Sequence, residues 1–351
     1  MEKERISQEI EEELINVLKL VAPGTSLRVS LDDILKAGLG GLIVIGDTPN
    51  IMNIINGGFE LNCKFTPQKL IELCKMDGAI VLDGDARKII YANTLLVPDF
   101  SIQTNETGTR HKAAERTAKQ TNQIVIAISE RKKHVTIYRG SFKYVLKSTA
   151  EVLDRAAETA RMLEKHKEIL NELLLNLNVL EFTSLASLSD VILVIQRMEI
   201  CERIADIIRR YIIETGTEGT LVKIQLKELI KGVAEEEIMV LRDYSRKDPL
   251  LTKVHLSEIS LEDLIEPMNI VKALNYTKMD ESINTKGVRI LNKISLPHED
   301  LQKMVDRFGN LQAVFDTPIE SLIELLRETK AKIFHKEINK LKDQVMLGKR
   351  I

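Results

Sequence analysis

The feature that most constrains the fold is a change of pattern at Glu151. From there to about Leu175, apolar residues return every three or four positions, which is the spacing of one long amphipathic helix. These residues are Leu153, Ala156, Ala160, Leu163, Leu170, Leu174 and Leu177. The pattern resumes between about Ser187 and Ile213, with Val191, Ile195, Met198, Ala205 and Ile208 on one face. We therefore expect residues 151–286 to form an all-α spine that separates two other domains.

Residues 1–150 mix strand and helix patterns. The apolar run Gly38–Gly46 predicts a buried strand bounded by glycine. Two apolar runs on either side of Asp83-Gly84 predict a β-hairpin. A helix is expected over 110–120, followed by two strands within 122–140. Together these patterns predict an α/β domain over 1–150, with a mixed sheet flanked by helices.

Residues 287–351 have a different charge balance from the spine. They carry 12 basic and 9 acidic residues, whereas residues 151–286 carry 18 and 25. Three short helices are expected, joined by turns at Leu296-Pro297, Gly309-Asn310 and Thr317-Pro318. At the last turn, Thr317 as N-cap and Glu320 at the third helical position predict a capping box. Short helices with basic turns can hold a phosphate backbone. An ordinary helical bundle is the alternative.

Composition excludes several classes of protein. The net charge is −2 over 351 residues, which argues against a wholly basic nucleic-acid coat. Cys63, Cys74 and Cys201 form no CxxC pair, so neither a disulfide framework nor a cysteine zinc site is expected. The charged N-terminus lacks the apolar region of a signal peptide, and the apolar stretch 177–195 contains charged residues that exclude a membrane span. We expect a cytoplasmic protein without membrane contact.

Three polar clusters lie where strands are expected to end. Gly108-Thr109-Arg110-His111-Lys112 opens a predicted helix, where free backbone N–H groups and the helix dipole favour a phosphate and Arg adds a bidentate donor. A solvated basic helix start is the alternative. Taken alone, Asp77-Gly78-Ala79 and the segment 129–133 are better explained by ordinary turns. Their combination in one α/β domain predicts a site for a polyphosphate and a divalent cation.

The order of these clusters resembles the signature of the diadenylate cyclases. Asp77-Gly78-Ala79 is followed about thirty residues later by Gly-Thr-Arg-His and a basic residue. The apolar strands around them and Ala113-Ala114-Glu115-Arg116 after them also fit. The order of a cyclase domain (1–150), a helical spine (151–286) and a helix–hairpin–helix-like DNA-binding domain (287–351) is similar to that of bacterial cyclases that bind DNA. The resemblance covers nearly the whole chain.

The resemblance implies that two ATP molecules condense into cyclic di-AMP with loss of two pyrophosphates. It implies a homo-oligomer, an octamer in the family, because two domains must face each other. Asp77 would bind Mg²⁺ or Mn²⁺ and help to activate the 3′-hydroxyl, with Arg110 and His111 as further catalytic residues. The implied ATP-binding residues are Gly78, Ala79, Leu96, Thr109, Arg110, His111, Lys112, Ala113 and Ser129.

The sequence departs from the family pattern in two places. Lys112 replaces the usual Arg and keeps its charge without the bidentate fork, while Ala113 stands where Thr is frequent. In the tail, the stretch 325–330 contains none of the glycines of the usual hairpin. Weak, salt-dependent DNA binding is therefore expected, through the charges of Arg327, Lys330, Lys332, Lys336 and Lys340.

Two other interpretations remain open at this level. The chain could be a DNA-binding sensor whose nucleotide site regulates without catalysis, or an oligomeric scaffold without turnover. Asp77 favours the enzyme, because a regulatory ATP site needs phosphate donors but no carboxylate for a metal beside the reacting hydroxyl.

Overall fold

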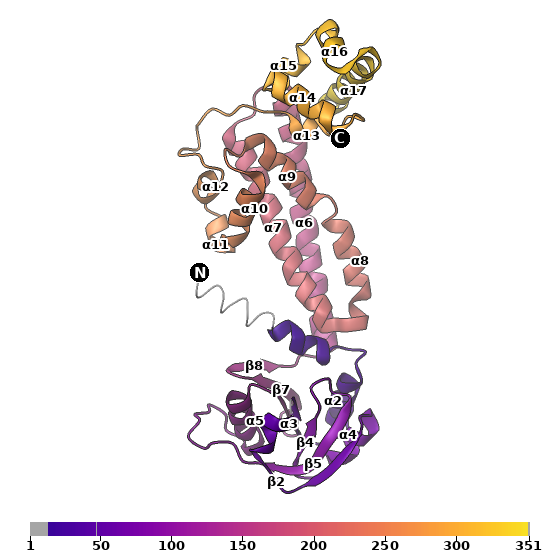
Figure 1. Ribbon diagram of the computed structural model, residues 1–351, viewed down its shortest axis with the longest axis vertical. Coiled ribbons are helices and arrows are strands. Elements are labelled where there is room, and N and C mark those ends of the chain that lie inside the picture. The colour runs from indigo at the N-terminus through magenta and orange to yellow at the C-terminus, as the bar shows by residue number, and fades with distance from the viewer. Residues whose placement is uncertain (1–12, 47, 350–351) are drawn as a thin grey trace. The chain divides into compact units, whose positions relative to one another are not determined.

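The computed structural model describes residues 13–46 and 48–349 (Figure 1). Its contacts group the chain into two compact units. The first comprises the chain up to Ala157 together with Arg209–Lys223, and the second comprises Glu158–Ile208 together with Ile224–Ile351. The division into three domains at 150 and 286 stays a prediction.

The first unit is built on an eight-stranded sheet. Its mixed pairing confirms the mixed sheet predicted from the sequence. Its strand order is β2-β5-β4-β1-β6-β7-β8, with β3 paired to β5. β1 and β4 are parallel, and the other pairs are antiparallel. The strands are β1 Gly41–Ile45, β2 Ile55–Asn56, β3 Phe59–Lys64, β4 Ala79–Leu82, β5 Lys88–Leu96, β6 Ile124–Ser129, β7 His134–Arg139 and β8 Phe142–Val145.

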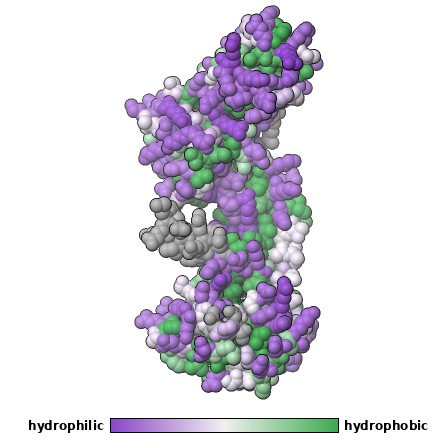
Figure 2. All heavy atoms as spheres, viewed as in Figure 1, coloured by the Kyte–Doolittle hydropathy of each residue, from purple (hydrophilic) through white to green (hydrophobic). Residues whose placement is uncertain are grey.

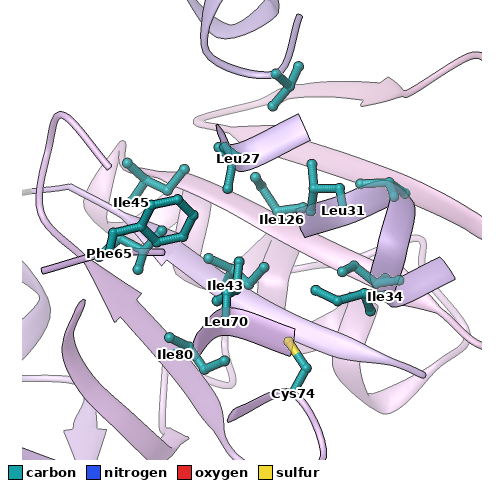
Figure 3. Close-up of a cluster of buried hydrophobic side chains, with 14 of the residues drawn as sticks. Leu27, Leu31, Ile34, Ile43, Ile45, Phe65, Leu70, Cys74, Ile80 and Ile126 are labelled. Atoms are coloured by element: carbon teal, nitrogen blue, oxygen red, sulfur yellow. The ribbon is translucent and has the colours of Figure 1, made fainter. Parts of the chain in front are cut away.

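Helices cover both faces of this sheet because its central strands are apolar on both sides. On one face, Ile43 and Ile45 of β1 pack with Leu31 of α2 (Ser26–Lys36) and Leu70 of α4 (Pro67–Leu73) (Figure 3). On the other face, Val44 packs with residues of α3 (Thr48–Met52) and α5 (Thr109–Thr121). Alternate side chains of a strand point to opposite faces, so a strand buried on both faces reads as a continuous apolar run. This confirms the strand expected within Gly38–Gly46.

In the part of the second unit that the structure describes, the regular elements are all helices. Most of α6 (Thr149–Phe182) and α7 (Leu188–Thr215), the two longest helices, lies in this unit (Figure 1). Both long helices expected from the apolar spacing are confirmed. The first turns of α6, up to Ala157, and the last turns of α7, from Arg209, belong to the first unit. After α7 come η1 Gly216–Gly219, which belongs to the first unit, and α8 Thr220–Leu229, which crosses the boundary at Lys223. The next helices are α9 Val233–Tyr244, α10 Pro249–Glu258, α11 Leu261–Leu264 and α12 Pro267–Ala273.

The first of the C-terminal helices, α13, carries Arg289, whose 1% exposed side chain pairs with buried Glu181 and with Glu236. The turns expected at 296–297, 309–310 and 317–318 all lie between helices, so these predictions are confirmed. The helices are α13 Val288–Leu291, α14 His298–Phe308, α15 Leu311–Phe315, α16 Ile319–Leu326 and α17 Glu328–Met346.

The capping box predicted at Thr317 is wrong. The N-cap of α16 is Pro318, which forms no side-chain capping hydrogen bond. The Thr317 hydroxyl instead donates to the carbonyl of Ala313, at 2.5 Å. A threonine hydroxyl can donate a hydrogen bond to the carbonyl four residues earlier. Because the Thr317 hydroxyl does so, it does not cap the N-terminus of the following helix.

One residue, Arg327, connects α16 to α17. It has φ 67° and ψ 158°, a conformation that is essentially restricted to glycine. The chain therefore makes a turn of the kind glycine allows without having a glycine there.

Among the described residues, none of the helices is both long and apolar enough to span a membrane. Figure 2 shows hydrophilic residues over most of the visible face of the C-terminal helices.

Candidate active site

The start of α5 carries the predicted phosphate-binding sequence. Gly108 is the N-cap and has no side chain that could accept the N–H groups of the first turn. These groups lack partners within the helix, so the helix presents donors and a partial positive charge to any bound anion. Thr109, Arg110 and His111 occupy this first turn. The sequence folds this way because alanine-rich 113–118 packs on the sheet, with Ala114 and Ala118 fully buried.

Arg110 lies in a space that exists because residue 40 is glycine. A Cβ built on Gly40 would lie 2.1 Å from Nη1 of Arg110. The guanidinium also reaches toward Asp77, with 4.0 Å between Nη2 and Oδ1, and the Asp77 side chain is fully exposed. Nearby, burial raises the pKa of the Cys74 thiol to about 12, against the opposing effect of Arg110. The thiol therefore stays protonated, and Asp77 is the anion that Arg110 faces.

Gly78 is needed for a close approach between two strands. A Cβ at Gly78 would lie 2.3 Å from the backbone carbon of Asn93 on β5. Asn93 itself has φ 53°, and its Oδ1 accepts a hydrogen bond from the Gly78 N–H at 3.2 Å. The pairing of β4 and β5 is irregular here. This irregular pairing fixes the position of Asp77 just before the start of β4. Asn93 is therefore a residue of the site, although no sequence pattern indicated it.

A first pocket, the Asp77 pocket, has a volume of about 360 Å³ and brings together seven of the residues predicted from the sequence. It lies between the start of β4, the end of β5 and the start of α5. The predicted residues that line it are Asp77, Gly78, Ala79, Leu96, Thr109, Arg110 and Ala113.

The apolar wall of this pocket contains Leu95 as well as Leu96. Leu96 is 7% exposed and packs in the core cluster beside β1, whereas Leu95 is 64% exposed. Leu95 therefore offers more apolar surface to a flat ring than the residue the resemblance indicated. The alternation of side chains along β5 is the signal that could have identified it.

A second pocket, the His111 pocket, has a volume of about 320 Å³ and lies on the other side of the α5 N-terminus. Predicted residues His111 and Ser129 line it, together with basic Lys132 and Lys143. The Ser129 hydroxyl accepts the backbone N–H of Lys132 at 3.2 Å, which orders the turn between β6 and β7. Different residues of the first turn of α5 line the two pockets, Thr109 and Arg110 in one and His111 in the other. The pockets can therefore hold adjacent parts of one ligand.

The His111 ring is half-buried between other polar groups of this pocket. Its centroid lies 5.9 Å from that of His134 and 6.4 Å from that of Tyr138. Burial lowers the pKa of His111, while Glu106 acts in the opposite direction, so the ring is neutral at pH 7. Its Nε2 is buried and has no hydrogen-bond partner among the described residues. A buried polar atom of this kind favours a polar ligand.

Glu106 organises the basic side of the same pocket. It accepts hydrogen bonds from the Tyr138 hydroxyl at 2.9 Å and from Lys143 Nζ at 2.5 Å. Burial alone would raise the pKa of Glu106, but these two donors hold it below its usual range. Glu106, His134 and Lys143 were missed at the sequence level, because no local motif connects residues so distant along the chain.

Lys112 is the one predicted nucleotide-binding residue that lines neither pocket, and it is exposed. The helix explains this position. Consecutive residues are rotated by about 100° around the axis, so Lys112 points away when Arg110 and His111 face the pockets.

Of the residues predicted to bind DNA, two already have acidic partners. Lys330 pairs with Asp300, and Lys332 pairs with Glu328 at 2.6 Å. Arg327 and Lys336 are exposed.

Within the described ranges 13–46 and 48–349, there is no group of three or more His, Cys, Asp or Glu side chains placed to hold a metal. Asp77 would have to bind a cation together with ligand oxygens and water, which is how Mg²⁺ is commonly held beside phosphates.

Comparison with known protein families shows to which class the fold and the site belong. Residues 28–142 match the DAC family, which is described as DisA bacterial checkpoint controller nucleotide-binding. Residues 146–283 match the DisA bacterial checkpoint controller linker region. The N-terminal domain is therefore a nucleotide-binding domain of the diadenylate cyclase family.

Full-length relatives define the family more closely. A DNA integrity scanning protein DisA from Clostridioides difficile (strain 630) is 42% identical, over 96% of this chain and 98% of its own. Those from Clostridium botulinum (strain Loch Maree / Type A3) and Acetivibrio thermocellus are also 42% identical, each over 97% of this chain and 99% and 97% of their own. The chain belongs to the DisA family of DNA integrity scanning proteins.

Proposed function

We propose that this protein is a diadenylate cyclase, which condenses two ATP into cyclic di-AMP and two pyrophosphates. The observation that carries the proposal is the Asp77 pocket. It combines an exposed carboxylate, a guanidinium 4.0 Å from it and the open N-terminus of α5. A purely regulatory nucleotide site would need donors for the phosphates, but it would not need a carboxylate in the position of Asp77.

In this proposal, adenosine lies in the Asp77 pocket against Leu95 and Leu96, and the phosphates lie along the first turn of α5. Arg110, Thr109 and the backbone N–H groups hold the α-phosphate and stabilise the charge that develops on it. The phosphates beyond it extend toward His111 and Ser129. Lys132 then balances part of the charge of the leaving pyrophosphate.

Each half-reaction forms one bond and breaks one. The 3′-oxygen of one ATP bonds to the α-phosphorus of the other, and the bond from that phosphorus to the bridging oxygen of pyrophosphate breaks. Asp77 helps to remove the hydroxyl proton. A bound Mg²⁺ or Mn²⁺ would neutralise phosphate charge and make the hydroxyl more acidic.

The same chemistry requires a homo-oligomer. One domain with one ATP cannot close a ring that contains two nucleotides, so two Asp77 pockets must face each other. We propose the octamer of the family as the working form, in the cytoplasm, where ATP and DNA occur together. A monomer that converts ATP to cyclic di-AMP would contradict this part of the proposal.

The test is to incubate the full chain with ATP and Mg²⁺ or Mn²⁺ and to identify the product by mass. The wild type and the control Asp85→Asn, another exposed carboxylate of this domain, should make cyclic di-AMP. Asp77→Asn should make none and keep its oligomeric mass. Formation of product by Asp77→Asn at the wild-type rate would show that the assigned role is wrong.

We further propose that α16, Arg327 and α17 form a helix–hairpin–helix that binds DNA and couples it to the cyclase. The connection of α16 to α17 by a single residue of positive φ supports this, because such hairpins present backbone N–H groups to phosphate. A DNA sensor with a non-catalytic nucleotide site is the second candidate. Wild-type protein that binds ATP but forms no product, with or without DNA, would favour it.

A further inference from the structure

Of the polar side chains that line the Asp77 pocket, Asn93 is the one that the proposed placement of the phosphates leaves unused. The polar residues of the lining are Asp77, Asn93, Thr94, Thr109 and Arg110. Thr94 is 1% exposed, and its hydroxyl donates to a backbone carbonyl of β4 at 3.1 Å. Asp77 and Arg110 face each other, and Thr109 lies in the first turn of α5. The amide of Asn93 therefore remains for another part of the nucleotide.

A hydrogen bond within the protein fixes which way the Asn93 amide is turned. Its Oδ1 accepts the N–H of Gly78 at 3.2 Å, so the Nδ2 group is the part of the amide that is left for a ligand. The side chain is exposed, and among residues 13–46 and 48–349 its Nδ2 has no hydrogen-bond partner. Asn93 therefore offers two N–H donors to the pocket beside Asp77.

The same face of β5 carries this amide and the apolar wall of the pocket. Asn93 and Leu95 are exposed, whereas Thr94 and Leu96 are buried, so Asn93 and Leu95 lie on one face of the strand. Two residues of a strand span about 6.6 Å. This length is similar to the separation between a purine ring and the hydroxyl groups of its ribose. A base that packs on Leu95 can therefore place a ribose hydroxyl at Asn93.

The position of Asp77 indicates which hydroxyl lies there. Gly78, whose N–H is bonded to Asn93, directly follows Asp77 in the chain, so the amide and the carboxylate line the pocket side by side. The proposed reaction places the 3′-hydroxyl at Asp77. The 2′-hydroxyl is attached to the adjacent carbon of the ribose, and its oxygen can accept a hydrogen bond from Nδ2 of Asn93.

We propose that Asn93 binds the 2′-hydroxyl of the nucleotide and thereby selects ribonucleoside triphosphates over their 2′-deoxy forms. The contact also holds the ribose so that the neighbouring 3′-hydroxyl stays at Asp77. A 2′-deoxynucleotide offers no acceptor to the amide, so it binds more weakly. This inference rests on the placement of adenosine in the proposed function, but its test does not require turnover.

The test is calorimetric titration of the full chain, in the presence of Mg²⁺, with two ATP analogues that cannot form the 3′ linkage. 3′-Deoxy-ATP keeps the 2′-hydroxyl, whereas 2′,3′-dideoxy-ATP has neither hydroxyl. The ratio of their dissociation constants therefore measures the contact made by the 2′-hydroxyl. The wild type should bind 3′-deoxy-ATP about tenfold more tightly, which is the effect of one hydrogen bond.

Asn93→Gly should bind the two analogues with nearly equal affinity. Asn93 has φ 53°, which glycine adopts readily, so the substitution removes the amide without straining the backbone. Because the ratio is taken within one variant, a general loss of affinity caused by a displaced Asp77 cancels. The matched control is Asn62→Gly, at another exposed asparagine with positive φ that does not line the pocket, and it should keep the wild-type ratio.

Equal affinity of the wild type for the two analogues would overturn the proposal, and so would a wild-type ratio in Asn93→Gly or the absence of saturable binding of both. Failure of the cyclase proposal gives a different result, because the wild type would then form no cyclic di-AMP from ATP while the binding ratios could still be measured. In the active enzyme, kcat/KM for 2′-deoxy-ATP should be about tenfold below that for ATP, and this preference should disappear in Asn93→Gly.

Discussion

The guanidinium of Arg110 occupies the space that a side chain on Gly40 would fill. The two residues are 70 positions apart, yet the catalytic geometry proposed for Arg110 depends on the absence of a Cβ at residue 40. Gly40 directly precedes β1, so the central strand of the sheet and the start of α5 together fix the position of the guanidinium.

Gly40→Ala should therefore displace Arg110 and lower kcat/KM for cyclic di-AMP formation by about 10²-fold, the usual effect of losing one preorganised donor. The measurement is the initial rate of product formation across ATP concentrations. Gly84→Ala is the matched control, because a Cβ there meets nothing within 4 Å. Unchanged kinetics in Gly40→Ala would mean that Arg110 does not act from the position described.

Arg327→Gly should stabilise the C-terminal helices by about 1 kcal/mol or more, because glycine adopts the observed φ and ψ without strain. Hydrogen exchange of the amides in α16 and α17 measures this locally in the full chain. Lys332→Gly provides the contrast, since glycine inside α17 should destabilise it by about 1 kcal/mol. Faster exchange in Arg327→Gly would show that the turn is not strained.

The stability of the second unit should fall as the pH rises from about 5 to about 8. Lys253 Nζ lies 2.8 Å from Glu199 and 2.5 Å from Glu237, and both carboxylates are buried. Burial and the charge of Glu199 raise the pKa of Glu237 from 4.5 to about 8. Between these values the folded protein holds a proton that the unfolded chain releases, so the free energy of unfolding falls by about 1 kcal/mol per pH unit.

Burial also raises the pKa of Asp243 to about 7, in the same direction. Glu237→Gln should therefore reduce the pH dependence without removing it, while Glu235→Gln, at an exposed position of the same helix, should leave it unchanged. Urea unfolding of the full chain at several pH values measures both. A pH dependence in Glu237→Gln equal to that of the wild type would contradict the assignment.

DNA binding should depend steeply on salt, and Lys336 should contribute more to that dependence than Lys332. A cation that contacts phosphate adds about one unit to the slope of log K against log salt. Lys332 already pairs with Glu328, whereas Lys336 is exposed and has no such pair within 13–46 and 48–349. Binding of branched and linear DNA to Lys336→Ala and Lys332→Ala across a salt series tests this. Tight, structure-selective binding that hardly changes with salt would contradict it.

Local pattern was sufficient for β1, α5, the two long helices α6 and α7, and part of the site. β1 and α5 follow from an apolar run and from alanine-rich sequence, and Thr109, Arg110 and His111 are adjacent along the chain. Gly40 and Asn93 could not be predicted in the same way, because their roles arise only when β1, β5 and α5 come together. The same holds for Glu106, His134 and Lys143, which the sheet and the loop before α5 assemble.

In the C-terminal helices, by contrast, the local sequence pattern predicted the wrong local structure. Thr317 has the right neighbours for an N-cap, but its hydroxyl bonds backward to Ala313. Arg327 has a side chain that disfavours positive φ, yet packing of Leu326 and Ala331 in the core of the C-terminal helices imposes that turn. In both places the three-dimensional surroundings outweigh the preference of the residue.

The neutral, buried Cys74 has a practical consequence for following the protein in solution. Alkylating reagents attack the thiolate, and burial raises the pKa of Cys74 to about 12 and that of Cys201 to about 11. Cys63 on β3 is the most accessible of the three thiols. A fluorescent maleimide at neutral pH should therefore label the native sequence selectively at Cys63, giving a single reporter on the N-terminal domain without any cysteine having to be removed.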